Sequence, residues 1–268
     1  MIHSIDPAAC TGCGTCTKTC PLDVFRLEPA QEALSPCMAA CPAGVDIRGN
    51  HYLIQQGHLG EAARRYRSVQ PFPAITGRVC FHPCEEKCAR NHVDEAVNIN
   101  AVEQIMGDWD LKAPLEKPAR RHITKVAVIG SGPAGLSCAW FLAQMGYPVT
   151  VFEAMPLPGG MLRYGIPAYR LPDAIVAAHI ARLEAMGIAF RCNTKIGEGA
   201  DLSLSDLKRL GFKAVMLAPG TTVSRKVHME GVELPGVHWG LEFLRANRGD
   251  EQPRLSGDVL VIGGGDVA

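Results

Sequence analysis

Short apolar runs separated by polar, glycine-containing turns occupy the second half of the chain. They lie at residues 125–129, 149–153, 212–217 and 258–262. Short continuous apolar runs bounded by turns are typical of strands in a parallel sheet, which is buried on both faces. The segment after the first run stays apolar as far as Gly146, and it predicts a helix that connects two parallel strands. We therefore predict an α/β domain in this half of the chain.

Apart from a short strand predicted at residues 22–27, the apolar positions of the first half recur at helical intervals. Residues 97–109 are predicted as an amphipathic helix. Glu103 lies beside the apolar side of that helix, and the pattern alone favours a solvated carboxylate there. The apolar positions are Tyr52, Leu53, Leu59, Ala62, Ala63 and Tyr66 in an earlier helical stretch and Ile99, Val102, Ile105, Met106 and Trp109 in the later helix. This pattern predicts a small helical domain.

Composition and charge narrow the class of protein. The proline- and charge-rich stretch at residues 112–121 is typical of a linker between the two halves. The chain has 268 residues, of which 47% are hydrophobic, as in a folded globular protein. Its 27 basic residues balance 27 acidic ones, so charge gives no reason to expect nucleic acid or a membrane as a partner. Neither a membrane span of roughly 18 apolar residues nor a secretory signal is recognisable, so we expect a cytoplasmic protein.

The cysteines are concentrated at one end of the chain. Nine of the eleven lie within the first 88 residues, and only Cys138 and Cys192 lie beyond. A secreted disulfide scaffold would distribute its cysteines differently and would normally carry a signal peptide. The concentration therefore predicts metal or cluster ligands, and we interpret the two isolated cysteines as packed structural thiols.

The first four cysteines have the spacing of [4Fe–4S] ligands. The run C-x2-C-x2-C-x3-C-P lets thiolates converge on one cluster from a single tight loop. Its ligands would be Cys10, Cys13, Cys16 and Cys20. In two-cluster ferredoxins the fourth cysteine of such a run ligates the other cluster. The spacing therefore does not decide which cluster Cys20 ligates. A zinc knuckle is the alternative, although zinc sites favour two separated cysteine pairs.

The remaining five cysteines are less regular. Cys37 and Cys41 stand before a proline, and Cys80, Cys84 and Cys88 follow about forty residues later. The nine cysteines and Glu103 give ten candidate ligands. Because a cubane takes four ligands, this region holds at most two clusters ligated entirely by protein.

The apolar run at 125–129 opens a dinucleotide-binding fingerprint. In the turn G-x-G-x-x-G, Gly130 permits the tight bend, Gly132 lets a pyrophosphate approach the backbone, and Gly135 allows close helix–strand packing. The next run ends at Glu153, 23 residues after Gly130, where a carboxylate for ribose hydroxyls belongs. The strand, turn, helix, strand and acid occur in the expected order, and this order predicts a nucleotide site.

Two further glycine turns follow. Residues 212–217 lead to Gly220, and residues 258–262 lead to Gly263 and Gly265, the start of a second fingerprint. Two nucleotide sites in one chain suggest a flavin and a nicotinamide, because hydride passes from one to the other. We include all three glycines among the predicted cofactor contacts.

The motifs of the chain resemble those of a known family. It is similar to the small subunit of NADPH-dependent glutamate synthase, to the N-terminal half of dihydropyrimidine dehydrogenase, and to other electron-input subunits that contain FAD and iron–sulfur clusters. The resemblance covers residues 35–268, and residues 1–30 look like a fused ferredoxin module. The motifs that carry it are C-x3-C-P at 37–42, GRVC at 77–80, C-x3-C at 84–88, GSGPAG at 130–135, the block GGMLRYGIPAYRLP at 159–172, and VIGGG at 261–265.

The resemblance implies cofactors and their ligands. The residues that match the family's FAD contacts are Gly130, Ser131, Gly132, Pro133, Ala134, Gly135, Glu153, Gly160, Met161 and Arg170. One family cluster uses three cysteines and a helix-borne Glu or Gln, which match Cys41, Cys80, Cys84 and Glu103. This implied role reverses the expectation of a solvated carboxylate at Glu103.

The sequence departs from the family in two respects. The other family cluster would use Cys37, Cys88 and two cysteines of a closely spaced upstream pair, and no such pair stands just before Cys37. Either that cluster is missing or the Cys10–Cys20 module replaces it, with one or two clusters in all. Members of the family also continue through a complete NAD(P) domain, so we expect this chain to be a fragment or one piece of a split protein.

The expected fold is α/β, with a ferredoxin-like segment and a helical iron–sulfur domain ahead of a Rossmann-like FAD domain and the start of a second, NAD(P)-binding one. The expected boundaries are 1–30 for the ferredoxin-like module, 31–112 for the helical cluster domain, 113–122 for the linker, 123–256 for an incomplete FAD domain and 257–268 for the truncated NAD(P) domain.

We predict an oxidoreductase subunit of a hetero-oligomer that passes electrons between NAD(P)H, FAD and clusters, to or from a partner subunit. That partner would be glutamate synthase-like, an aldehyde or oxoacid oxidoreductase, or ferredoxin-linked. Hydride transfer requires no acid–base side chain, so no catalytic proton-transfer residue is predicted.

Three alternatives stay open. A disulfide reductase would need a Cys-x-x-Cys near the flavin, and Cys138 and Cys192 are isolated. A zinc-binding module fused to a Rossmann domain would be colourless. An FAD and iron–sulfur subunit without its own NAD(P)H site would transfer electrons but would not oxidise the nicotinamide.

Overall fold

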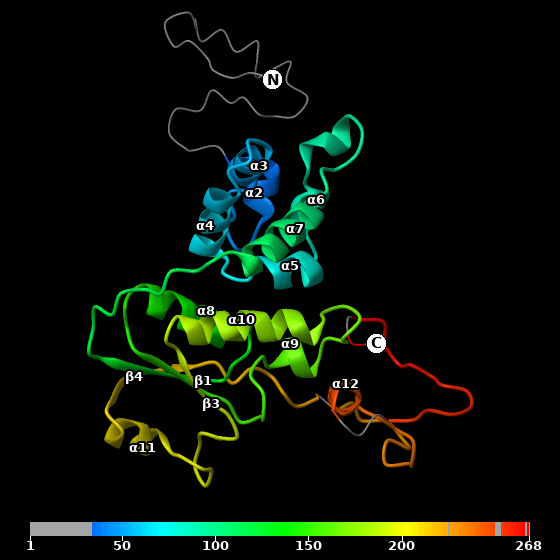
Figure 1. The fold of residues 1–268 in the computed structure, drawn as a ribbon. Helices are drawn as coiled ribbons and strands as arrows, with labels where there is room; N and C mark the ends of the chain where they lie inside the picture. The colour runs from blue at the N-terminus through cyan, green and yellow to red at the C-terminus, as the bar shows by residue number, and fades with distance from the viewer. Residues whose placement is uncertain (1–33, 225, 250–252, 266, 268) are drawn as a thin grey trace, which may run out of the picture. The chain divides into compact units, whose positions relative to one another are not determined.

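The computed structural model describes residues 34–224, 226–249, 253–265 and 267. The chain divides into two compact units, Met1–Lys112 and Ala113–Ala268. The four cysteines Cys10, Cys13, Cys16 and Cys20 and the strand predicted at 22–27 lie outside the described residues. Figure 1 shows the described part of each unit, which begins at residue 34 in the first.

The described part of the first unit is helical. Its helices are α2 (Pro36–Ala40), α3 (Ile47–Gln55), α4 (Leu59–Val69), α5 (Pro73–Val79), α6 (Pro83–Glu86), the 3-10 helix η1 (Ala89–His92) and α7 (Ile99–Lys112). Proline occupies the first turn of α2, α5 and α6, where its fixed φ suits the helix and its missing N–H is not needed. Helices this short are marginal alone, so their stability comes from packing.

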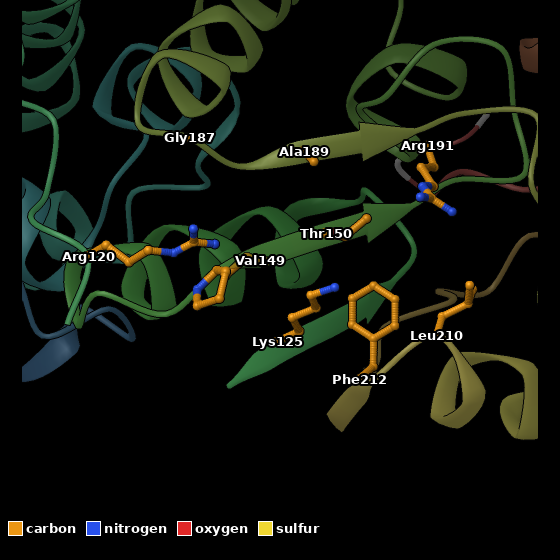
Figure 2. Close-up of a pocket in the computed structure, with 10 residues that line it drawn as sticks. Arg120, Lys125, Val149, Thr150, Gly187, Ala189, Arg191, Leu210 and Phe212 are labelled. Carbon is orange, nitrogen blue, oxygen red and sulfur yellow. The ribbon is translucent and has the colours of Figure 1, made fainter. Parts of the chain in front are cut away.

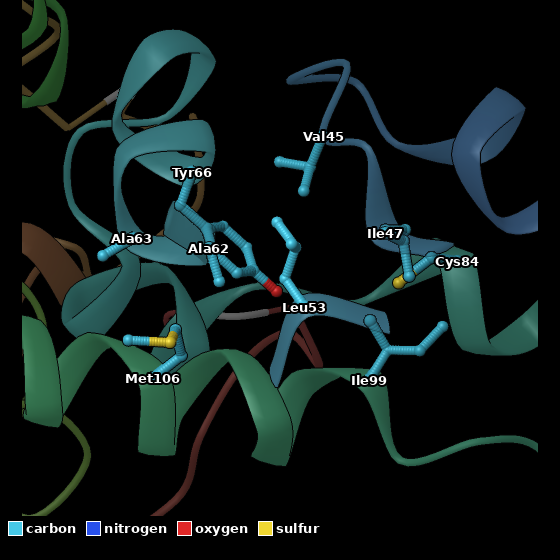
Figure 3. Packing of buried hydrophobic residues seen from close by; sticks show 9 residues of the cluster. All are labelled: Val45, Ile47, Leu53, Ala62, Ala63, Tyr66, Cys84, Ile99 and Met106. Atoms are coloured by element: carbon cyan, nitrogen blue, oxygen red, sulfur yellow. The ribbon is translucent and has the colours of Figure 1, made fainter. Parts of the chain in front are cut away.

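The core of this unit contains apolar side chains and one thiol (Figure 3). Its buried members are Val45, Ile47, Leu53, Ala62, Ala63, Tyr66, Cys84, Ile99 and Met106. Cys37 and Cys41 pack against this cluster. The predicted helical stretch before residue 66 is therefore confirmed as α3 and α4, which also contact each other.

The predicted helix over 97–109 is confirmed as α7. The prediction of which side of this helix is buried is partly wrong. Ile105 is 71% exposed and Trp109 is 38% exposed, whereas Gly107 is buried. A Cβ atom on Gly107 would collide with the backbone of Ala74, and one on Gly77 would lie 2.5 Å from the backbone of Gln104. The close contact between α5 and α7 therefore uses glycines rather than large apolar side chains, which turns the apolar stripe away.

The second unit contains a four-stranded parallel sheet in the order β3-β2-β1-β4. Its strands are β1 (Lys125–Ile129), β2 (Val149–Phe152), β3 (Ala189–Arg191) and β4 (Phe212–Leu217). Its helices are α8 (Pro133–Gln144), α9 (Met161–Tyr164), α10 (Asp173–Ala185), α11 (Leu204–Arg209) and α12 (Gly240–Arg248). The predicted parallel α/β domain is confirmed.

Helices cover the two faces of this sheet. α8 packs against β1 and β2, and α11 packs against β4 (Figure 1). Val128 and Val151 are fully buried, as expected for continuous apolar strands between layers. On the face with α11, Phe152 and Phe212 meet edge to face at 5.6 Å between ring centroids. None of the described helices is long and apolar enough to cross a membrane.

The strand that we predicted at 258–262 is absent from the structure. These residues have neither helix nor strand, and Leu260 and Ile262 are 86% and 72% exposed. A strand needs a neighbour for its backbone hydrogen bonds, and no described segment pairs with this one. An apolar pattern alone therefore did not suffice to form the strand.

Candidate flavin and cluster sites

The glycine turn after β1 is held in a conformation that only glycine tolerates. Gly130 has a φ of +98°, and a Cβ atom there would collide with the carbonyl oxygen of Ala218. Its N–H donates to the carbonyl oxygen of Phe152 at 2.8 Å, which ties the turn to β2. A Cβ atom on Gly135 would likewise collide with the carbonyl oxygen of Gly130, so α8 begins directly against the turn. The predicted steric roles of both glycines fit this geometry.

A second glycine loop lies against this turn. Gly160 has a φ of +53°, and its Cβ atom would lie 2.7 Å from the Cα atom of Gly132. Gly159 N donates to Ser131 Oγ at 2.9 Å. Met161 follows at the start of α9. Two segments about thirty residues apart are thereby joined at the carboxyl ends of the strands, where ligands of open α/β sheets bind.

Glu153 joins these two loops. It is only 7% exposed. Its Oε2 accepts hydrogen bonds from Ser131 N at 3.0 Å and from Ser131 Oγ, and its Oε1 accepts one from Met155 N at 2.8 Å. A carboxylate oxygen has two acceptor positions, so Oε1 retains one for a ribose hydroxyl. The sequence indicated the carboxylate but gave no signal that Ser131 would bridge it to the second loop.

The space beside the backbone of Gly132 is open. No heavy atom lies within 4 Å of the position of a Cβ atom on Gly132, whose φ is −71°. Pro133 and Ala134 open α8, whose N-terminal end carries partial positive charge. An open backbone beside a helix N-terminus fits a pyrophosphate.

The other predicted cofactor contacts are not gathered at the turn. Arg170 is exposed. Gly220 follows β4 with a φ of +68°, and Gly263 and Gly265 lie in the exposed segment after residue 258. No heavy atom lies within 4 Å of a Cβ position on any of these three glycines. The first fingerprint, Glu153 and Gly160–Met161 therefore lie together. The other predicted contacts in this paragraph lie away from them.

A separate cavity of about 290 Å³ opens at the amino ends of the strands (Figure 2). It is lined by the first residue of each strand, including Lys125 and Phe212, and by Arg120 and Arg191. The glycine turn stands at the opposite, carboxyl ends of the same strands. This cavity is accordingly not part of the candidate flavin site.

In the helical unit, three of the predicted cluster ligands influence one another. Burial raises the pKa of Cys84 to about 12, with further contributions from Glu85, Cys41 and Cys80. The pKa of Cys80 is also raised, again mainly by burial. Thiols must lose their protons to bind iron, so binding of a cluster to these side chains would release protons. In the structure from residue 34 onward, no three His, Cys, Asp or Glu side chains stand in a metal-binding arrangement.

The loop between Cys80 and Cys84 has an unusual backbone. His82 has a φ of +42°, which is uncommon for a residue other than glycine. Its N–H donates to Cys80 Sγ at 3.2 Å. This bond is of the kind that supports thiolate ligands, because an amide hydrogen bond to sulfur favours the charged form.

Glu103 is not the solvated carboxylate that the helical pattern favoured. Its Oε1 accepts hydrogen bonds from Gln70 Nε2 at 2.9 Å and from Thr76 Oγ1. Burial raises the pKa of Glu103, and the two hydrogen bonds oppose that shift. The sequence did not indicate Gln70 or Thr76 as partners. The carboxylate is therefore partly buried and hydrogen-bonded within the unit.

Cys37 and Cys88 line one cavity of about 500 Å³. Ser35 Oγ lies 3.1 Å from Cys37 Sγ, and Val97 N donates to Cys88 Sγ at 3.5 Å. His51 lines the same cavity, and burial lowers its pKa. The two cysteines that the family resemblance assigned to one cluster thus share a cavity.

Cys138 and Cys192 do not have the properties of a redox-active pair. Burial raises the pKa of both thiols, and Glu153 and Glu184 raise that of Cys192 further. A reactive cysteine needs a lowered pKa. The structural interpretation of these two thiols is consistent with these shifts.

Comparison with protein families supports this division. A 4Fe-4S binding domain matches residues 3–26, dihydropyrimidine dehydrogenase domain II with its 4Fe-4S cluster matches residues 31–114, and pyridine nucleotide-disulphide oxidoreductase matches residues 124–268. The predicted combination of iron–sulfur and nucleotide-binding domains is confirmed.

Three relatives match over most of the chain. The chain is 38% identical over 259 residues to the NADPH-Fe(3+) oxidoreductase subunit beta of Geobacter sulfurreducens, covering 92% of this chain and 37% of the relative. It is 36% identical over 273 residues to the glutamate synthase [NADPH] small chain of Bacillus subtilis, covering 91% and 55%. It is 34% identical over 243 residues to the NAD-dependent dihydropyrimidine dehydrogenase subunit PreT of Salmonella typhimurium, covering 87% and 57%.

These matches confirm the resemblance that the motifs indicated. The chain spans between 37% and 57% of the length of these three relatives. The family domain at residues 124–268 accounts for more than half of the chain. The chain belongs to the pyridine nucleotide-disulphide oxidoreductase family and carries iron–sulfur domains ahead of that family's domain.

Proposed function

We propose that this chain is the electron-input part of an NAD(P)H-linked iron–sulfur flavoenzyme. It would bind FAD in the sheet-containing unit and [4Fe–4S] clusters in the N-terminal unit. The observation that carries the proposal is the double glycine loop, in which Gly160 lies against Gly132 and both loops are tied to Glu153 through Ser131. This arrangement leaves an open backbone beside the N-terminus of α8.

FAD would exchange a hydride for single electrons, and the clusters would carry those electrons onward. The chain's own residues would bind and orient these groups. Gly132 and the first turn of α8 would hold the pyrophosphate, and Glu153 Oε1 would accept a ribose hydroxyl. The arrangement assigns no proton transfer to a side chain, because hydride exchange requires none.

The cluster ligands are proposed in two sets. Cys41, Cys80, Cys84 and Glu103 would hold one cluster, since burial and mutual charge effects connect them. Cys37 and Cys88 would contribute to a second cluster, completed by cysteines from the Cys10–Cys20 module. The domain boundaries predicted from the sequence are retained as part of this proposal.

A redox partner subunit is proposed as the electron acceptor or donor. The relatives include an NADPH-Fe(3+) oxidoreductase subunit beta and an NADP(+)-dependent formate dehydrogenase subunit beta, which are both subunits by name. We propose a cytoplasmic hetero-oligomer, because cysteine ligands need a reducing compartment to remain free of disulfides. Glutamate synthase-like, aldehyde or oxoacid oxidoreductase and ferredoxin-linked partners are all compatible.

The proposal is tested with the natural full-length protein, loaded with FAD and iron under anaerobic conditions. Addition of NADH or NADPH should bleach the flavin absorbance and then reduce the clusters. About eight iron atoms per chain support two cubanes, and four support one. Failure of both nucleotides to bleach the flavin would contradict the dehydrogenase assignment.

One observation favours a second candidate, an electron-transfer subunit without its own nicotinamide site. The second fingerprint at Gly263 and Gly265 is not preceded by a strand in the described part of the chain. In that case reduced partner protein, but neither nucleotide, would reduce the flavin in the same experiment.

A further inference from the structure

Arg248, the last residue of α12, bonds to two other helices. Its side chain is only 5% exposed. Its Nε donates to the carbonyl oxygen of Arg163 at 2.6 Å, and its Nη2 donates to Asp173 Oδ1 at 2.7 Å. Arg163 lies in α9, and Asp173 opens α10. This side chain therefore joins α12 to both of these helices.

Apolar burial does little to hold α12 in place. Every residue of the helix is exposed or half-buried, although the helix lies beside α9 (Figure 1). Arg245 Nη2 donates to the carbonyl oxygen of Thr222 at 2.9 Å, and Ser224 Oγ bonds to Glu242. Both of these bonds reach the loop that precedes α12. Among the described residues, Arg248 therefore provides the polar link from α12 to α9 and α10.

Arg163 continues this link to the second glycine loop. Its Nε donates to the carbonyl oxygen of Pro158 at 3.0 Å, and its Nη1 lies 3.3 Å from Asp173 Oδ1. A Cβ atom on Gly159, the next residue, would lie 3.1 Å from Cβ of Arg163. Gly159 N in turn donates to Ser131 Oγ. A continuous series of contacts therefore runs from α12 to the two loops of the candidate flavin site.

We infer that Arg248 is a positioning residue that couples FAD binding to the docking of α12. A second glycine loop that is held by FAD also orders α9, and α9 supplies the carbonyl oxygen that Arg248 binds. Such coupling is reciprocal, so docked α12 strengthens FAD binding by the same factor. The inference rests on the proposed function, because it requires FAD at the glycine turn.

The coupling has a consequence for the second fingerprint. In sequence, α12 is the last of the described helices before Gly263 and Gly265. Arg248 therefore connects the flavin site with the segment that leads to these glycines.

The test measures hydrogen exchange of α12 in the natural full-length protein, with and without FAD. A helix without buried residues exchanges by local opening, so its exchange rate reports its docking. FAD should slow the exchange of residues 240–248 about fivefold in the wild type, at the lower end of usual coupling. In Arg248→Met this slowing should disappear, and fluorescence titration should show FAD affinity weakened by the same factor.

Arg245→Met is the matched control, because Arg245 lies on the same helix and bonds to the preceding loop. It should keep the wild-type FAD affinity and the wild-type slowing. Arg248→Met should still fold, because Asp173 is half exposed and water can hydrate its carboxylate. A purely structural arginine would change the exchange of α12 without removing its dependence on FAD.

Arg248→Lys is the second variant. Lysine keeps the charge but lacks the planar fork of donors that bonds Arg163 and Asp173 together, so the slowing by FAD should be smaller than in the wild type.

The outcomes separate the inference from the function beneath it. A wild-type protein that binds no FAD overturns both. A wild type that binds FAD with no change in the exchange of α12 overturns only the role of Arg248. Full wild-type slowing in Arg248→Met, or in Arg248→Lys if the first variant does not fold, has the same meaning.

Discussion

The two candidate sites differ in how far the protein satisfies their polar groups by itself. In the sheet-containing unit, the buried carboxylate of Glu153 accepts three hydrogen bonds from Ser131 and Met155. In the helical unit, the Tyr66 hydroxyl and the Asn50 amide are buried without partners among the described residues. Cys84 is buried there as well, with a pKa raised to about 12.

This difference indicates which of the two sites is already formed before its cofactor binds. The flavin site is built by backbone turns and a clamped carboxylate, so its shape does not depend on the ligand. The helical unit consists of short helices around thiols, and a metal that binds those thiols contributes directly to folding. We therefore expect the two units to respond differently to the loss of their cofactors.

The largest expected effect is that of iron removal. Chelation under reducing conditions should unfold residues 34–112, because bound metal contributes on the order of 10 kcal/mol in structural metal sites. The sheet-containing unit should keep its strands and its FAD. Hydrogen exchange followed by mass spectrometry measures both units in one sample. Equal loss of protection in the two units would contradict the contrast between them.

Substitutions of two glycines separate the shape of the flavin turn from its contact with the ligand. Gly130→Ala should destabilise the sheet-containing unit by about 3 kcal/mol, because φ is positive and the Cβ atom would collide with Ala218. Gly132→Ala should leave stability within about 1 kcal/mol, because its φ is ordinary and the space is open.

Gly132→Ala should nevertheless weaken FAD binding by tenfold or about 1.4 kcal/mol, because its methyl group would occupy the pyrophosphate position. Urea unfolding gives the stability of each variant, and fluorescence titration with FAD gives the affinity. Unchanged FAD affinity in Gly132→Ala would show that the pyrophosphate does not pass this residue.

Loss of the serine that bridges the two loops should have a moderate effect. Ser131→Ala removes a donor from Glu153 and an acceptor from Gly159, and should destabilise the unit by about 2 kcal/mol. Ser224→Ala is the matched control, because Ser224 bonds to Glu242 at the surface. The control should change stability by less than about 0.5 kcal/mol. Equal effects in thermal unfolding would contradict the importance of burial.

The smallest expected effect concerns His51 and pH. Burial lowers its pKa from 6.5, so the unfolded chain binds this proton more readily than the folded one. Stability should fall as pH decreases below about 6.5, by less than ~1.4 kcal/mol per pH unit because the ring is partly exposed. His51→Gln should flatten this dependence in the helical unit, whereas His58→Gln, at an exposed position, should not. Parallel profiles of stability against pH for the wild type and His51→Gln would contradict the role of His51 in this pH dependence.

Local chemistry predicted most of the sheet-containing unit. The strand at 125–129, the bend at Gly130 and the carboxylate at Glu153 all follow from patterns within thirty residues of one another. The prediction of a strand at 258–262 was wrong. A strand forms only where a neighbouring strand completes its backbone hydrogen bonds, and the sequence of this segment alone does not show whether such a neighbour is present.

Burial in the helical unit was less predictable. The sequence indicated the helix over 97–109, but its buried side was decided by the glycines at the contact with α5. The helical pattern predicted Glu103 in solvent, but the side chain is partly buried and bonded to Gln70 and Thr76. Both outcomes depend on a partner helix that is distant in the sequence.

The sequence by itself determined the cysteine spacing, the order of strand, turn and helix, and hence the family, because these depend on neighbouring residues. Only the tertiary structure decided that Ser131 would join two loops, that α7 would turn Ile105 outward, and that Tyr66 would bury its hydroxyl group. The physical reason is that packing and hydrogen bonding between distant segments depend on close contact, which sequence separation does not encode.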